Sequence, residues 1–232
     1  MFAAFTACQS QRNTSNAKHL RVLFFFEEMT VSMSFTSRIK KEMTEGIVRA
    51  ILEDAQYRVI DSGIEKVLRE LSCLTSAEYG ALGYPDAMSH LPDFTVMNRE
   101  QTTKQLVEVK YRTSWKKELL LEVEDQVKIF GEIVLVSVNA KAPDPNGHNL
   151  PARFLRCCRL KYDGGIYKVE LNRQNKDKST YQVWEPVKAL NDGTWLWWAM
   201  RPLHEVFNQL KEDSNKDTLS HAVEALAGIL EQ

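Results

Sequence analysis

The clearest hydrophobic pattern in the chain lies between residues 36 and 56. Apolar side chains recur there at three- and four-residue steps, at Ile39, Met43, Ile47, Ala50, Ile51 and Ala55. This spacing predicts a helix with one apolar face. Tyr57 to Asp61 then alternate between apolar and polar residues and end at Ser62-Gly63, which predicts a short strand followed by a turn.

Two further strands are predicted at residues 94–98 and 105–112, and the polar stretch between them is typical of a hairpin loop. Residues 116–130 carry an apolar face at helical spacing. Residues 132–139 contain a nearly continuous apolar run, Ile133-Val-Leu-Val-Ser-Val, which is typical of a strand covered on both faces. The order helix, strand, hairpin, helix, strand predicts an α/β core with a central mixed sheet flanked by helices.

Three segments lie outside this core of residues 35–140. Residues 1–34 are rich in Ser, Thr, Asn and Gln, and we expect a poorly ordered N-terminal extension or a short strand near Val22–Phe26. Residues 64–91 are predicted to be an insertion that begins with a helix at 64–74. Residues 141–232 are expected to complete or extend the same domain with strands at 153–161, 166–172 and 181–184 and helices near 202–211 and 218–230.

Composition narrows the class of protein. The 232 residues are 44% hydrophobic and 26% charged with a net charge of -1, which excludes a disordered or polybasic chain. No apolar run approaches the roughly 20 residues needed to cross a bilayer, so we expect no membrane partner. The four cysteines form no C-x-x-C pair, and a reducing cytoplasm is the expected location.

The candidate chemistry lies in the predicted hairpin. Glu108 and Lys110 are two residues apart on one strand and therefore point to the same face, whereas Val107 and Val109 point to the other. Asp93 begins the partner strand, so pairing can bring it beside Glu108 and Lys110. Adjacent carboxylates favour a hard cation such as Mg²⁺, and a lysine beside that cation can stabilise charge on a phosphate. The alternative is an ordinary charged surface.

The segments Pro92-Asp93-Phe-Thr-Val and Leu106-Val-Glu108-Val-Lys110 resemble the PD-(D/E)xK nuclease superfamily, which has the restriction-endonuclease-like fold. The stretch from Glu45 to Gly63 is similar to the opening helix and strand of archaeal Holliday-junction resolvases. This resemblance implies a deoxyribonuclease, most simply an endonuclease, that uses Mg²⁺ or Mn²⁺. It implies that Glu45, Asp93 and Glu108 are metal ligands and that Lys110 is the catalytic lysine.

Nucleic acid, most simply DNA, is the expected partner. Residues 99–117 hold six basic side chains against two acids, and Arg112, Lys116 and Lys117 are candidate phosphate contacts. Some superfamily members contact DNA through a glutamine and a tyrosine four residues apart. Gln126 matches that glutamine, whereas Phe130 stands in place of the tyrosine.

Three alternatives remain open. The chain could be a nuclease-fold protein that binds nucleic acid or acts as a scaffold without cutting, a nuclease that acts on RNA, or an interaction protein. The aromatic residues of the C-terminal third are interpreted as core or as a homodimer interface, and base stacking is the alternative for Tyr181, Trp184, Trp195, Trp197 and Trp198.

Overall fold

A computed structural model describes residues 35–63, 76–142 and 151–210, together with helical positions 218, 221, 222, 224, 225 and 228. The described residues from Arg38 onward belong to one compact unit. The expected N-terminal extension and the helix predicted at 64–74 lie outside the described residues, as does most of the helix predicted at 218–230.

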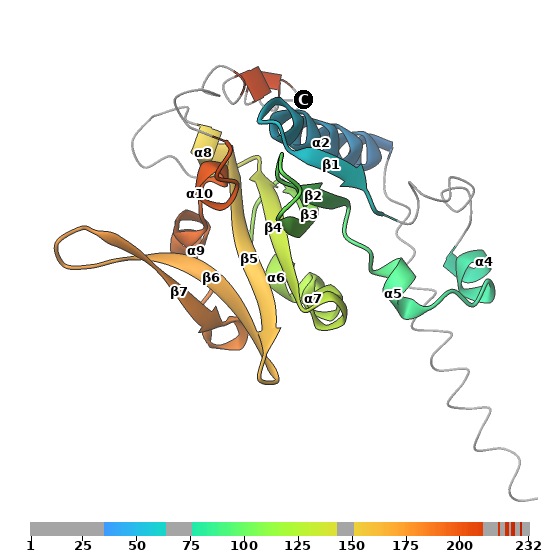
Figure 1. Ribbon diagram of the computed structural model, residues 1–232. Helices are drawn as coiled ribbons and strands as arrows, with labels where there is room; N and C mark the ends of the chain where they lie inside the picture. Colours follow the sequence, from blue (N-terminus) through green and yellow to red (C-terminus); the bar gives the residue numbers. More distant parts are fainter. Residues whose placement is uncertain are drawn as a thin grey trace, which may run out of the picture. The chain divides into compact units, whose positions relative to one another are not determined.

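Seven strands form one sheet whose spatial order follows the chain (Figure 1). The strands are β1 (Arg58–Asp61), β2 (Phe94–Met97), β3 (Lys104–Arg112), β4 (Glu132–Asn139), β5 (Leu155–Asp163), β6 (Ile166–Gln174) and β7 (Thr180–Pro186). Only β3 and β4 pair in parallel, and all other neighbours are antiparallel. The expected α/β class with a mixed sheet is confirmed, and the C-terminal strands extend that same sheet.

Helices precede, connect and follow these strands. They are α2 (Phe35–Asp54), α4 (Ser76–Ala81), α5 (Asp86–Ser89), α6 (Glu118–Glu122), α7 (Glu124–Phe130), α8 (Pro151–Phe154), α9 (Thr194–Ala199) and α10 (Leu203–Val206), with a 3₁₀ turn, η2, at Val187–Ala189. A parallel strand pair needs a crossover connection, and α6 and α7 supply it between β3 and β4. The prediction of one continuous helix at 116–130 is wrong, because Val123 departs from helical geometry and divides the segment into α6 and α7.

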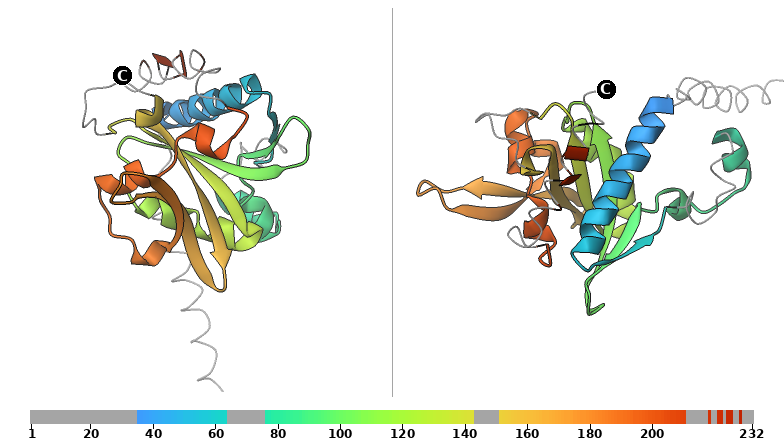
Figure 2. Two further views of the ribbon diagram at one scale, coloured as in Figure 1. Left: turned by 60° about the vertical axis from the view of Figure 1, so that its left-hand side comes forward. Right: turned by 90° about the horizontal axis from the view of Figure 1, so that it is seen from above.

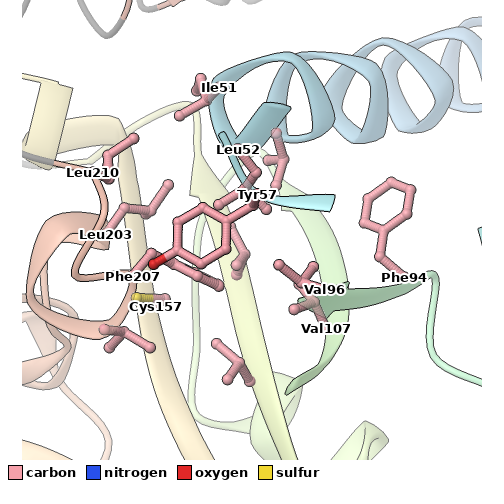
Figure 3. Close-up of a cluster of buried hydrophobic side chains, with 14 of the residues drawn as sticks. Ile51, Leu52, Tyr57, Phe94, Val96, Val107, Cys157, Leu203, Phe207 and Leu210 are labelled. Atoms are coloured by element: carbon pink, nitrogen blue, oxygen red, sulfur yellow. The ribbon is translucent and has the colours of Figure 1, made fainter. Parts of the chain in front are cut away.

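One face of the sheet packs against α2, and we call it the α2 face. Val107 and Val109 of β3 lie there with apolar side chains of α2 such as Ile51 and Leu52, and all four are at most 2% exposed (Figure 3). Figure 2 shows α2, drawn in blue, running along this side of the sheet. Burial of these valines confirms the predicted phase of β3.

The opposite face packs against α6 and α7, and we call it the α7 face. Leu119, Leu120 and Val127 of the two helices contact a core that includes Leu135 of β4 and Leu160 of β5. In β4, every residue after Glu132 is buried. The expectation of a strand covered on both faces is therefore confirmed for residues 132–139.

Three of the C-terminal aromatic residues lie in a helix and not in the β-rich segment that the sequence predicts. Trp195, Trp197 and Trp198 lie in α9, and Trp197 is 2% exposed in the core of the α7 face. The helix predicted at 202–211 is reduced to α10, which ends at Val206. No helix in the described part of the chain is both long enough and apolar enough to span a bilayer.

Candidate active site

The β2–β3 hairpin brings the first two acidic side chains together. Phe94 pairs with Val107, so extending the antiparallel register by one residue sets Asp93 opposite Glu108. Asp93 Oδ2 accepts a hydrogen bond of 2.8 Å from the backbone N–H of Val109. The backbone oxygen of Asp93 accepts a second one of 3.0 Å from the N–H of Ser62, which ties this position to the end of β1.

Glu108 and Lys110 project from β3 toward the α7 face, as their spacing predicts. The Lys110 ammonium forms an ion pair with Glu108 Oε1, and Gln126 Nε2 of α7 donates to Glu108 Oε2 at 2.9 Å. Glu108 is only 5% exposed, whereas the side chain of Lys110 is 26% exposed. Lys110 is therefore partly open to solvent, whereas Gln126 of α7 covers Glu108.

Glu45 reaches the site from α2. It occupies the buried side of that helix, one turn before Val48, and is 3% exposed. Its Oε1 lies 3.6 Å from the Lys41 ammonium, which is an i,i+4 ion pair on the same helix. Glu45 is close enough to Asp93 for its charge to act on that carboxyl group.

The electrostatics of the cluster are dominated by Asp93. Burial and repulsion from Glu108 and Glu45 raise the pKa of Asp93 from 3.8 to about 7, against the opposing effects of the Val109 N–H and the Lys110 ammonium. Three acids share the site with two nearby lysines, Lys41 and Lys110. A proton or an added cation relieves the remaining negative charge.

The negative charge of this cluster suits a divalent cation, whereas the arrangement of its described side chains does not enclose one. Among the described residues, no three histidine, cysteine or acidic side chains are arranged to enclose a metal ion. Both oxygens of Glu108 already have partners, so a metal on this carboxylate would have to displace Lys110 or Gln126. The donor chemistry, oxygen ligands with excess negative charge, is that of Mg²⁺ or Mn²⁺.

The structure places the predicted nucleic-acid contacts in four different settings. Arg112 pairs with Glu122 of α6, and Lys116 is exposed. Lys117 donates through Nζ to the backbone oxygen of Leu190 at 2.5 Å. Gln126 is 8% exposed and bonded to Glu108, so its position fits the support of Glu108 and does not fit a surface contact with nucleic acid.

Ser137 is a polar residue of the site that the sequence analysis missed. It pairs with Lys110 in the parallel β3–β4 register and is fully buried. Its hydroxyl has no hydrogen-bond partner among the described residues. The sequence did mark this residue, because Ser137 is the one polar side chain within the apolar run Ile133 to Val138. Its position in the strand register places it beside Lys110 on the α7 face.

Comparisons with known proteins return no relative. No family model, no curated protein and no solved structure matches the chain.

Proposed function

We propose that this protein is a metal-dependent nuclease of the PD-(D/E)xK type that hydrolyses phosphodiester bonds, most simply as an endonuclease on DNA. The observation that carries the proposal is the grouping of Asp93, Glu108 and Lys110 at one hairpin, with Glu45 close to Asp93. We further propose the cytoplasm as its location, and the buried free thiols of Cys157 and Cys158 are compatible with a reducing compartment.

The order of elements supports the same proposal. A helix, three antiparallel strands, a helical crossover and a parallel strand occur in the order α2, β1–β2–β3, α6–α7 and β4. This is the order that the restriction-endonuclease-like resemblance implies for residues 35–140. The later strands, β5 to β7, would then be additions at one edge of that core.

Each site residue has a distinct proposed role. Asp93 and Glu108, assisted by Glu45, would hold Mg²⁺, which when bound supplies a Lewis acid and lowers the pKa of a coordinated water. Lys110 would stabilise negative charge on the attacked phosphate, because it is the lysine that contacts Glu108 in this site. Gln126 would hold Glu108 in orientation from α7.

One observation favours a second candidate, a protein of the same fold that binds nucleic acid without cutting it. Glu108 is buried and both of its oxygens are bonded to protein groups, which is a stable arrangement without metal. An RNA substrate is a third possibility, since metal-assisted phosphodiester chemistry is common to both nucleic acids. The experiment must therefore separate binding from cleavage and DNA from RNA.

The test compares Lys110→Ala with Lys104→Ala, an exposed lysine on the same strand β3. Supercoiled plasmid, linear duplex, single-stranded DNA and RNA are each incubated with Mg²⁺ or with EDTA. We expect cleavage with Mg²⁺ and none with EDTA. The cleavage rate should fall about a hundredfold or more for Lys110→Ala and should not fall for Lys104→Ala. A gel shift in EDTA should show both variants binding nucleic acid as the wild type does, because each removes one charge among many.

Asp93→Asn should lose both Mg²⁺ binding and cleavage, since it removes a charged ligand. Wild-type cleavage by the Lys110→Ala variant would remove this lysine from the mechanism. Binding without cleavage by the wild type, in Mg²⁺ and in Mn²⁺, would establish the second candidate in its place.

A further inference from the structure

A cavity of about 300 Å³ opens where the parallel strands β3 and β4 end. Its walls include Trp115 and Lys116 after β3, Asn139 and Lys141 at the end of β4, and Thr194 and Trp197 of α9. None of these residues belongs to the carboxylate cluster. The cavity is therefore a separate feature of the α7 side of the sheet.

The strand register fixes how the cavity lies relative to the candidate active site. Lys110 pairs with Ser137, and Arg112 pairs with Asn139, which lines the cavity. These pairs follow each other on the α7 face, and two residues of a strand span about 7 Å. One nucleotide step along an extended strand is of similar length. A chain whose phosphate lies at Lys110 would thus bring its neighbouring nucleotide toward the cavity.

The lining combines aromatic rings with cationic groups. Trp115 and Trp197 have ring centroids 5.9 Å apart at an angle of 50°. Trp115 is 8% exposed, and its indole Nε1–H has no acceptor among the described residues. Lys116 and Lys141 are both exposed at the rim. The two ammonium groups at the rim favour an anion.

The acid in the lining, Asp192, holds backbone groups through one of its oxygens. Asp192 Oδ1 accepts from the backbone N–H of Lys117 at 3.2 Å and from that of Gly193 at 3.0 Å. Its carboxylate thus anchors the loop before α9. Lys116 and Lys141 outnumber this one acid, so the charged side chains of the lining still favour a phosphate.

We propose that this cavity receives one unstacked nucleotide of the strand bound at the carboxylate site, with its base inside the cavity and its phosphate near Lys116 and Lys141. The inference rests on the proposed function and deepens it. The volume is at the lower end for small-ligand sites and admits one nucleotide but no base pair. The preferred substrate is accordingly a strand with an unpaired nucleotide beside the cleaved bond.

The test fills the cavity with Ser114→Leu, because Ser114 is exposed and lines it. Thr113→Leu is the matched control, since Thr113 is also exposed and is outside the lining. Fluorescence anisotropy measures binding of a short labelled single strand and of the corresponding blunt duplex in EDTA, where no metal-dependent cleavage occurs. We expect Ser114→Leu to weaken single-strand binding about tenfold and duplex binding less than twofold, with no effect of Thr113→Leu. Circular dichroism checks that both variants fold.

Lys141→Ala provides a second test that leaves the cavity open. It should weaken binding of deoxyadenosine monophosphate and of the single strand while leaving binding of the uncharged nucleoside unchanged. Equal strand affinities for the Ser114→Leu and Thr113→Leu variants would overturn the proposal. Loss of mononucleotide binding with unchanged strand affinity would also overturn it, because the cavity would then serve a free nucleotide. If Ser114→Leu weakens single-strand binding and the wild-type protein does not cleave nucleic acid, the cavity proposal holds and the nuclease proposal is refuted.

Discussion

Asp93→Asn should make the protein more stable, and the gain should grow as the pH rises. Asparagine keeps an oxygen that can accept the 2.8 Å hydrogen bond from the Val109 N–H. It removes a carboxylate that lies beside Glu108 and Glu45. The variant therefore removes the cost of burying the Asp93 charge and its repulsion from the other acids, while it keeps the contact that shapes the hairpin.

The size of the effect follows from the pKa of Asp93, which burial and the neighbouring acids raise from 3.8 to about 7. Such a rise corresponds to about 4 kcal/mol, and we expect about half of it because Asp93 is only partly buried. Between these two pKa values the folded protein keeps a proton that the unfolded chain has lost, so stability falls with rising pH and levels off above about 7. More than a third of this change falls below pH 5, so the advantage of Asp93→Asn should increase by about 1.3 kcal/mol from pH 5 to pH 8.

Urea unfolding at pH 5 and pH 8 in EDTA measures this difference. Asp61→Asn is the control, because Asp61 lies on the adjacent strand β1 and faces the Arg49 guanidinium at 3.0 Å instead of other acids. That variant should show no gain at pH 8. Equal stability differences for Asp93→Asn at both pH values would refute the raised pKa of Asp93 and with it the unfavourable burial of negative charge in this cluster.

Two further predictions concern single contacts. Gln126→Leu should lower the cleavage rate about 10- to 100-fold and raise the Mg²⁺ concentration that gives half-maximal rate, because Glu108 loses its hydrogen-bond donor from α7. The control Gln182→Leu on β7 should change neither quantity in the same assay. Arg201→Met should destabilise the fold by about 3–5 kcal/mol in urea, since it leaves the buried Glu170 without its 2.7 Å partner, and adding Glu170→Leu should restore most of that loss. A single variant as stable as the double would contradict this account of the ion pair.

Much of the fold could be predicted because its signals are local. The helical spacing of residues 36–56 and the alternation of Tyr57 to Asp61 predict α2 and β1 within two residues at each end. The apolar run of residues 132–139 predicts β4 with its bounds. The division at Val123 and the early end of α10 could not be predicted, because no glycine or proline marks either position.

The site divides in the same way. Period-two alternation was sufficient to set Glu108 and Lys110 on one face and to bring Asp93 opposite Glu108. The burial of Glu108 could not be predicted from the sequence, because it depends on how α7 lies over the sheet and on the contact from Gln126. The cavity near Trp115 was equally hidden, since its far wall comes from α9, more than seventy residues later in the chain.

The burial of the acids also bears on the alternative of an ordinary charged surface. Glu45 and Glu108 are 3% and 5% exposed, and taking a carboxylate out of water costs several kcal/mol unless partners compensate. Lys41 and Lys110 offset part of this cost, yet burial and the charges of Glu108 and Glu45 still raise the pKa of Asp93 to about 7. Charged groups of an ordinary protein surface would remain in solvent. The burial of three acids at a cost in stability supports the proposed cation site over this alternative.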